Sequence, residues 1–159
     1  MSEPENLWSG RFTGKPDAEV FQFQASFAFD RHLFEDDVQG SLAWVEALAG
    51  AGVLSAEEAA TIQDGLSFIL DQGRQDPEFF NTADEDVHTF VERTLIDRVG
   101  DVGRRLHTGR SRNEQVSLDL RLYLRRRIPV LQGALVALVD ALAGEADAAG
   151  TVLMPAYTH

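Results

Sequence analysis

Apolar residues recur every three or four positions along most of this chain, which is the spacing of an amphipathic α-helix. The spacing predicts helices over about residues 34–49, 56–72, 82–99 and 114–148. We find no strict alternation of apolar and polar residues bounded by hairpin turns, the pattern that would predict strands. The sequence therefore predicts an all-α fold.

Polar residues and glycines mark the ends of the expected helices. Ser55 precedes one helix and Glu58 follows three residues later, which is the pattern of a capping box. Thr82 and Glu85 form the same pattern before the next helix. Glycines stand just past the expected helix ends, at Gly50, Gly73, Gly100 and Gly150. Residues 1–30 lack clear periodicity, and we expect them to form an extended arm.

The last expected helix has an unusual apolar pattern. Apolar residues recur at spacings of three and four from Val116 to Leu142, and its second half is apolar on more than one face. Pro129 should kink this helix or be absorbed locally. A helix of this kind needs several neighbours, as in the middle of a bundle. We therefore expect residues 1–110 to form an arm and an N-terminal helical domain, and residues 111–159 to begin a central helix-bundle domain that is truncated here.

Charge is unevenly distributed along the chain. The net charge is −12, made up of −15 over residues 1–103, +6 over 104–127 and −3 over 128–159. An acidic chain disfavours general nucleic-acid binding. The local arginine cluster fits either a small-anion site or ion pairs with the acidic remainder of the chain. There is no Cys, no signal-peptide pattern, and no apolar run near the roughly 18 residues of a membrane helix, so we expect a cytoplasmic protein without membrane contact.

The densest group of polar residues, 107–115, leads into the longest expected helix. The first N–H groups of that helix have no partner within it, and an arginine can add charged donors, so the segment suits a carboxylate or a phosphate. Gly109 would let the backbone come close to such a ligand. The simpler alternative is that Ser111 or Asn113 is an ordinary N-cap beside solvated arginines.

Histidines supply the other candidates for chemistry. His88 stands one position from Val87, at the edge of an expected apolar face, and could exchange a proton or simply complete a helix start. Asp86, His88 and Glu92 do not have the spacing of a metal site, and we expect no metal. Ser26, Thr158 and His159 carry little information by themselves.

Taken together, four segments resemble one family. Residues 106–116, Leu-His-Thr-Gly-Arg-Ser-Arg-Asn-Glu-Gln-Val, closely resemble the L-H-T-G-R-S-R-N-D-Q-V signature of argininosuccinate lyases. Residues 7–12, 85–88 and 154–159 are similar to that family's L-W-G-G-R-F, E-D-[IV]-H and M-P-G-Y-T-H, in the same order. The departures are Ser9 for Gly, Glu114 for Asp and Ala156 for Gly, and none removes a matched functional residue.

The resemblance implies the fumarase/aspartase superfamily, whose members are mostly helical homotetramers with active sites assembled from three subunits. It implies reversible cleavage of argininosuccinate to arginine and fumarate by β-elimination without a cofactor, as in arginine biosynthesis. His159 then matches a catalytic residue, as proton acceptor or as acid for the leaving group, and His88 matches a second site histidine. The substrate-binding residues implied by the match are Ser26, Ser111, Arg112, Asn113 and Thr158.

The resemblance covers only an N-terminal portion of the family, which continues past residue 159 with a mobile loop bearing a catalytic serine and a lysine. We therefore expect the 159 residues to be inactive alone. The alternatives are another fumarate-releasing lyase such as adenylosuccinate lyase, a truncated non-catalytic assembly partner, and a crystallin-like structural relative.

Overall fold

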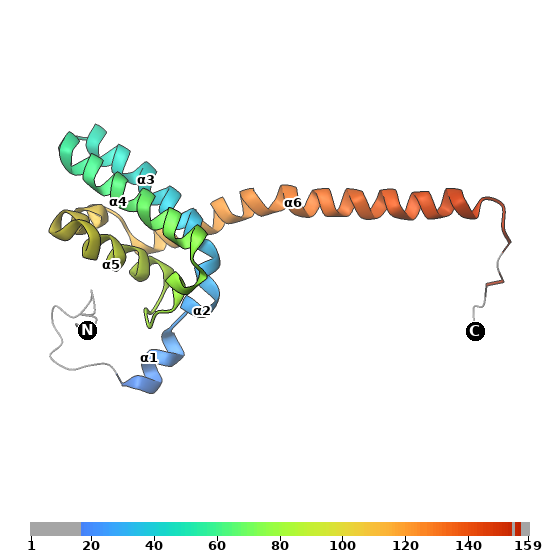
Figure 1. The fold of residues 1–159 in the computed structure, drawn as a ribbon, viewed down its shortest axis with the longest axis horizontal. Coiled ribbons are helices and arrows are strands. Elements are labelled where there is room, and N and C mark those ends of the chain that lie inside the picture. Colours follow the sequence, from blue (N-terminus) through green and yellow to red (C-terminus); the bar gives the residue numbers. More distant parts are fainter. Residues whose placement is uncertain (1–16, 154, 157–159) are drawn as a thin grey trace. The chain divides into compact units, whose positions relative to one another are not determined.

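The computed structural model describes residues 17–153, 155 and 156. Its described residues contain helices and no strand, which confirms the predicted all-α fold (Figure 1). The chain forms two compact units, Met1–Leu120 and Arg121–His159. The expected boundary of the complete bundle domain at residue 111 stays a prediction. The elements in chain order are α1 (Ala18–Gln24), α2 (Phe27–Asp30), η1 (Arg31–Leu33), α3 (Phe34–Gly50), α4 (Ala56–Gln75), η2 (Pro77–Phe80), α5 (Val87–Val99), η3 (Gly100–His107) and α6 (Arg112–Ala149).

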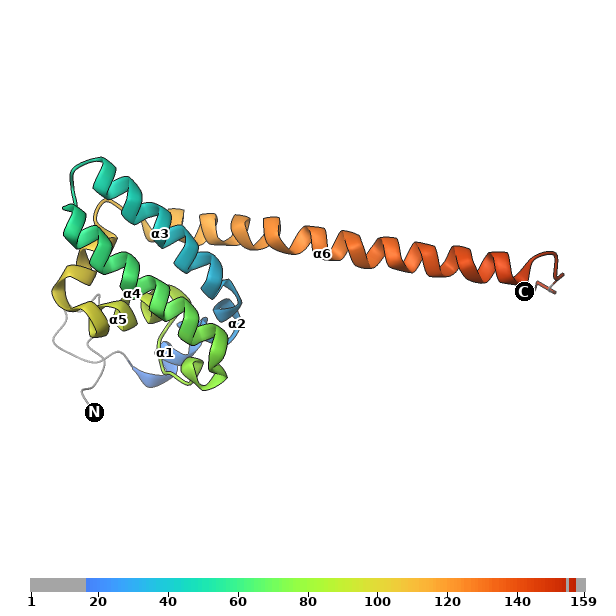
Figure 2. The same cartoon turned by 45° about the horizontal axis from the view of Figure 1, so that its top comes forward.

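The core of the first unit lies between α3, α4 and α5. Helices α3 and α4 form an antiparallel pair, and α5 packs against both of them (Figures 1 and 2). Each fully buried aliphatic side chain stabilises such a core by roughly 1.5–3 kcal/mol. An aromatic cluster closes the end of this core nearest α2 and η2. Its rings are those of Phe27, Phe34, Phe79, Phe80 and Phe90, with centroids of neighbouring rings 5.0–6.4 Å apart.

The predicted cap of α4 is confirmed. The Ser55 hydroxyl accepts from the Glu58 N–H at 3.1 Å, and the Glu58 carboxylate accepts from the Ser55 N–H at 2.9 Å. The helix runs to Gln75, so the expected end at Gly73 is wrong. Gly73 is instead an interior position whose missing side chain leaves room for the Phe34 ring. The glycine at this position is therefore explained by the close packing of the Phe34 ring and not by the end of a helix.

The predicted capping box at Thr82 is wrong. Helix α5 begins at Val87, and its N-cap is Asp86, whose carboxylate accepts from the Thr89 N–H at 2.6 Å. The Thr82 hydroxyl pairs with Asp84, whose carboxylate is occupied by a guanidinium from α5. Two acceptor-rich patterns overlap in this segment, and the one nearer the apolar run forms the cap.

The expectation of an extended arm is wrong for residues 18–30, which form the short helices α1 and α2. Asp17 caps α1 by accepting from the N–H groups of Glu19 and Val20 at 2.9 and 3.3 Å. Each helix has at most two turns, which is too short for a helical period to be recognised in the sequence. Residues 1–16 lie outside the described residues.

Helix α6 matches the predicted long helix within two residues at either end and continues through Pro129. Gly150, with φ of +57°, follows its end as predicted. Over the second unit its apolar side chains are exposed, among them Leu131, Val139 and Leu142, each with more than 60% of its surface accessible. By length and composition α6 could cross a membrane, with a mean hydropathy of 1.5 over its most apolar 18 residues. The sequence has no uninterrupted apolar run of this length, so a membrane helix was not expected here. The core helix of a soluble bundle can have the same mean hydropathy.

Candidate functional site

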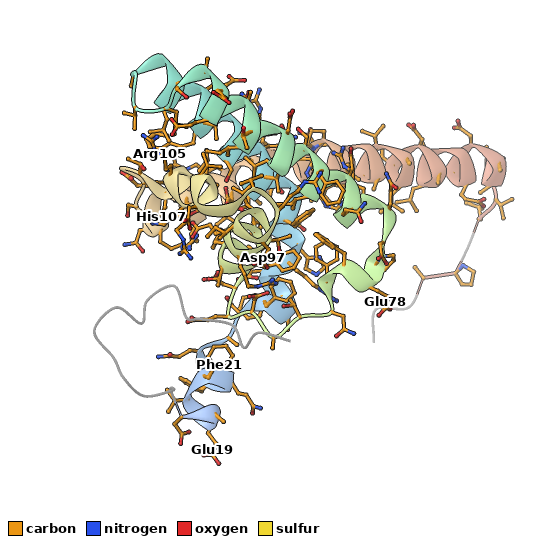
Figure 3. All side chains as sticks on the ribbon, turned by 60° about the vertical axis from the view of Figure 1, so that its left-hand side comes forward. Glu19, Phe21, Glu78, Asp97, Arg105 and His107 are labelled. Atoms are coloured by element: carbon orange, nitrogen blue, oxygen red, sulfur yellow. The ribbon has the colours of Figure 1, made fainter. Side chains whose placement is uncertain are left out.

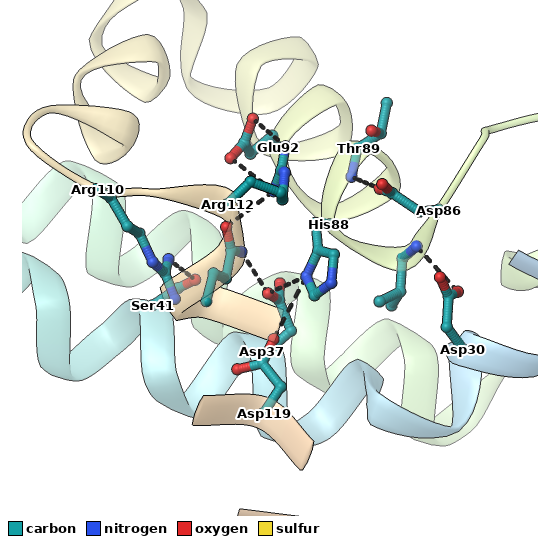
Figure 4. A network of polar contacts seen from close by, with 12 residues as sticks. Asp30, Asp37, Ser41, Asp86, His88, Thr89, Glu92, Arg110, Arg112 and Asp119 are labelled. Atoms are coloured by element: carbon teal, nitrogen blue, oxygen red, sulfur yellow. Dashed lines mark hydrogen bonds and ion pairs between the residues drawn. The ribbon is translucent and has the colours of Figure 1, made fainter. Parts of the chain in front are cut away.

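The centre of the candidate site is the buried ring of His88. Its Nδ1 lies 2.8 Å from Oδ1 of Asp37 and 3.3 Å from Oδ2 of Asp119 (Figure 4). The His88 side chain is 3% exposed, and both carboxyl groups are 0% exposed. The Gln115 side-chain amide donates a further hydrogen bond to Oδ1 of Asp37. An imidazole, an amide and two carboxyl groups therefore share one water-excluded space.

Three helices of the first unit position these groups. His88 is in the first turn of α5, directly after the Asp86 cap. Asp37 is in the first turn of α3. Gln115 and Asp119 are four residues apart at the start of α6, so they lie on the same face of that helix. The polar cluster thus occupies the place where the beginnings of three helices meet.

The two carboxyl groups differ in the hydrogen bonds they receive, and this separates their pKa values. Burial, first, and the neighbouring charge of Asp37 together raise the pKa of Asp119 to about 8. Burial also acts to raise the pKa of Asp37, but hydrogen bonds from His88, Asp119 and Gln115 outweigh it and lower that pKa. Burial therefore favours the neutral form of Asp119, and the converging donors favour the ionised form of Asp37.

Arg110 lies beside this pair, on the loop before α6. Its Nη1 donates to the Ser41 hydroxyl at 2.9 Å, and its Nη2 is buried without a hydrogen-bond partner among the described residues. Desolvation lowers the pKa of the Arg110 guanidinium, and attraction from the nearby carboxyl groups opposes that decrease. Arg110 is thus a half-buried positive charge next to a buried carboxyl pair.

A second group of contacts extends the network from the first. Arg112 contacts Glu92 at 3.2 Å and donates to the Gln115 side-chain oxygen at 2.8 Å. His107, on η3 (Figure 3), has its Nδ1 2.7 Å from the carboxylate of the same Glu92. Gln115 therefore connects Arg112 to Asp37. The arginine-rich loop and His88 belong to one continuous network.

Ser26, directly before α2, lies beside the segment that leads into His88. Its hydroxyl donates to Asp30, and the other oxygen of Asp30 accepts the Val87 N–H at 3.1 Å. The Ser26 N–H donates to the Glu85 carbonyl at 2.8 Å. These bonds hold Ser26 against the segment that leads into His88. Burial raises the pKa of Asp30, with the hydrogen bonds from Ser26 and Val87 opposing that shift.

Hydrogen bonds thus link Arg112 to His88 through Gln115 and Asp37, and they hold Ser26 beside the beginning of α5 through Asp30. His88 is buried, not placed at the edge of the apolar face as the sequence suggested, because α3 and α6 cover it with polar groups. Ser111 and Asn113 lie at the exposed beginning of α6, and the Ser111 carbonyl accepts the Gln115 N–H at 3.1 Å. Thr158 and His159 lie outside the described residues.

Sequence reasoning missed Asp37, Gln115 and Asp119. Asp37 is one of three consecutive acids in the first turn of α3, where acidic residues are common for reasons of the helix dipole alone. The spacing of Gln115 and Asp119 was the available signal, because it places two polar residues on one face of a helix otherwise rich in leucine. Only the packing of α6 against α3 shows that this face is buried.

The same cluster contains three atoms of ligand type, from Asp37, His88 and Asp119, within 4.8 Å of one another. Their contacts favour shared protons, because Nδ1 of His88 already bonds to Asp37 and an amide N–H points at the same oxygen. We therefore assign a hydrogen-bonded acid pair here and identify no metal ligand. The expected absence of a metal stays a prediction.

The sequence model of a family described as lyase matches residues 10–159. The chain belongs to this lyase family. It is 46% identical over 153 residues, 96% of the chain, to the argininosuccinate lyase of Roseiflexus sp. (strain RS-1). It is 43% identical over 155 residues, 98% of the chain, to that of Geobacillus thermodenitrificans (strain NG80-2), and 44% identical over 153 residues, 96% of the chain, to that of Desulforudis audaxviator (strain MP104C). The aligned region spans 34%, 34% and 33% of these three relatives, so the chain covers about a third of their length.

Proposed function

We propose that this chain supplies the N-terminal third of an argininosuccinate lyase, which cleaves argininosuccinate reversibly to arginine and fumarate in cytoplasmic arginine biosynthesis. The observation that supports this most directly is the likeness to relatives named argininosuccinate lyase over 96–98% of the chain. The likeness includes the segments that contain Ser26, His88 and the loop from 107 to 115.

The reaction needs groups of the kind found here. A base removes a proton from the carbon next to a carboxylate, the negative charge develops on that carboxylate, and an acid protonates the departing guanidino nitrogen. Donors that are fixed in place stabilise the developing charge at low cost. In this proposal Ser111, Arg112 and Asn113 at the start of α6 bind the succinyl carboxylates, together with Ser26.

The histidines have separate parts in the proposal. His88 binds or polarises a substrate carboxylate from its buried position. His159 acts in proton transfer at the reacting atoms, and Thr158 beside it binds substrate. Since Arg112 already contacts Glu92 and Gln115, it acts as a charged donor whose direction is fixed by the network. No cofactor takes part in this chemistry.

The exposed face of α6 supports the proposed assembly. Apolar side chains cover several sides of this helix over the second unit. Burying them against further helices would yield roughly 25 cal/mol for each Å² removed from water. We infer a homotetramer with a central helix bundle and active sites shared between subunits. Residues 1–159 by themselves should accordingly associate with themselves and show no turnover.

The test measures fumarate release by the full-length enzyme, meaning a protein of the relatives' length that contains residues 1–159. Argininosuccinate and adenylosuccinate are supplied separately at equal concentrations. The proposal expects turnover of argininosuccinate and at most trace turnover of adenylosuccinate. Preference for adenylosuccinate would reassign the substrate, and failure with both would leave a structural or assembly role.

A further inference from the structure

The two buried carboxyl groups beside His88 are chemically unequal, although both side chains are fully buried. Asp37 receives hydrogen bonds at Oδ1 from the His88 ring and from the Gln115 amide. Neither oxygen of Asp119 receives a hydrogen bond from an N–H or O–H group of the described residues. An anion is stabilised where donors converge on it, and a carboxyl group without donors keeps its proton when it is buried.

We propose that Asp37 and Asp119 are positioning residues that share one proton, with the ionised Asp37 accepting the Nδ1–H of His88 and the protonated Asp119 lying beside it as a neutral neighbour. The inference rests on the proposed function, since it assigns a task to His88 in that reaction. Nδ1 of His88 then always carries a proton, and the ring donates to the substrate carboxylate only when Nε2 carries a second proton. A flip of the His88 ring that swaps the positions of Nδ1 and Nε2 would break the hydrogen bond to Asp37.

The spare oxygen of Asp37 completes this arrangement. Oδ2 of Asp37 is buried and receives no donor from the described N–H and O–H groups. It is therefore the acceptor left for the carboxyl proton of Asp119. Asp119 is then the protonated acid and Asp37 the carboxylate. This is the arrangement expected when two carboxyl groups occupy one apolar space.

Charge balance supports one proton in the pair, not two or none. Half-buried Arg110 supplies one positive charge next to the pair, and one ionised carboxylate matches it. Two carboxylates would leave an excess negative charge away from water, which is costly. The charged or titratable groups around His88 are Asp30 on α2, Asp36 and Asp37 on α3, Asp86 and Glu92 around α5, Arg110 and Arg112 before and at the start of α6, and Asp119 on α6.

Two variants of nearly equal shape separate positioning from simple packing. Asp37→Asn removes the anion that orients His88, while Asp119→Asn replaces a neutral carboxyl group by a neutral amide. In the full-length enzyme at pH 7, D37N should lower kcat/KM by about 100-fold, mostly through kcat, because the ring loses its fixed orientation. D119N should lower it by less than about tenfold, since it keeps the charge of the pair. Glu46→Gln, an exposed charge removal on α3, is the control and should match the wild type.

The pH profile provides a readout that a packing role would not change. In the wild type, kcat/KM should fall as the pH rises past about 8, where Asp119 loses its proton. D119N should lack this alkaline limb. Equal losses in D37N and D119N, or an unchanged limb in D119N, would overturn the proposal. If D37N does not assemble, as judged by sedimentation, the profile of D119N decides alone.

The proposed function and this inference can fail separately. A wild-type enzyme that does not cleave argininosuccinate refutes the proposed function. The proton on Asp119 is then still tested by the pH dependence of thermal unfolding in the wild type and D119N, which needs no substrate. Curves that differ by a constant amount at all pH values would contradict the shared proton.

Discussion

Gly40 on α3 faces Asp119 on α6 so closely that a side chain at position 40 would crowd the carboxyl group. A Cβ added to Gly40 would lie 3.3 Å from Oδ1 of Asp119 and 3.2 Å from a methyl carbon of Leu118. The same position would be 3.6 Å from Nη2 of Arg110. This glycine therefore lets the beginning of α6 come close enough to α3 for its carboxyl group to enter the His88 site.

Gly40→Ala tests this close approach. Both crowded neighbours are side-chain atoms of α6, and they must give way by a few tenths of an ångström. We expect a loss of about 1–3 kcal/mol in the free energy of unfolding and a lower kcat in the full-length enzyme. Gly50→Ala is the matched control on the same helix, because nothing lies within 4 Å of its Cβ position. Denaturant unfolding of the two variants measures the difference, and equal stabilities would contradict the close approach.

The Ser55 cap gives a prediction about stability alone. Ser55→Ala removes the acceptor for the Glu58 N–H and should cost about 1 kcal/mol of unfolding free energy. Since α4 contributes none of the groups around His88, kcat and KM should not change. Ser67→Ala, an exposed serine in the middle of the same helix, should leave the stability unchanged or slightly higher. A kinetic defect in S55A would show that α4 has an influence on the site that the structure does not explain.

How stability depends on pH follows from the raised pKa of Asp119. The folded protein keeps this proton up to about pH 8, whereas the unfolded chain loses it near pH 4. The folded state therefore binds more protons between these values, and stability from this group is lost as the pH rises. The wild type should lose roughly 1 kcal/mol per pH unit relative to Asp119→Asn within this window. Thermal unfolding from pH 5 to pH 9 measures it, and the difference should level off above about pH 8.

The exposed Asn113 side chain is not one of the groups in the buried network around His88. Its proposed role in substrate binding is therefore tested by kinetics. Asn113→Ala in the full-length enzyme should lower kcat/KM by about 10²–10³, the usual loss when one donor to a developing negative charge is removed. Its unfolding free energy should change little because the side chain is exposed. Unchanged kcat/KM would remove Asn113 from the proposed site.

The expected absence of a metal is tested by a chelator. Prolonged dialysis of the full-length enzyme against a strong chelator should leave both activity and melting temperature unchanged, because the site is held by shared protons. Elemental analysis of the untreated protein supplies the control. A stoichiometric metal whose removal abolishes activity would show that Asp37, His88 and Asp119 had been assigned wrongly.

The sequence predicted the long helices well because their apolar residues repeat over many turns. Ser55 was also predictable, since its partner lies three residues away and the bond is local. The errors at Gly73 and Thr82 have another origin. Gly73 is required by a ring from a distant helix, and the Thr82 pattern competes with the better cap at Asp86.

The site was predictable only in part for a similar reason. His88 and the loop from 107 to 115 stood out because several polar residues are adjacent in sequence. Asp37 is 51 residues from His88 and 78 from Gln115, so nothing local links them. Their common role follows from the packing of three helix beginnings, which no periodicity encodes.

Restoration of growth tests the central claim most directly. The gene for the full-length enzyme is expressed in a bacterial strain that lacks argininosuccinate lyase and is plated without arginine. The account predicts growth with the wild type and with E46Q, and no growth with Asp37→Asn or Asn113→Ala expressed at the same level. No growth with a well-expressed, assembled wild-type protein would contradict the account.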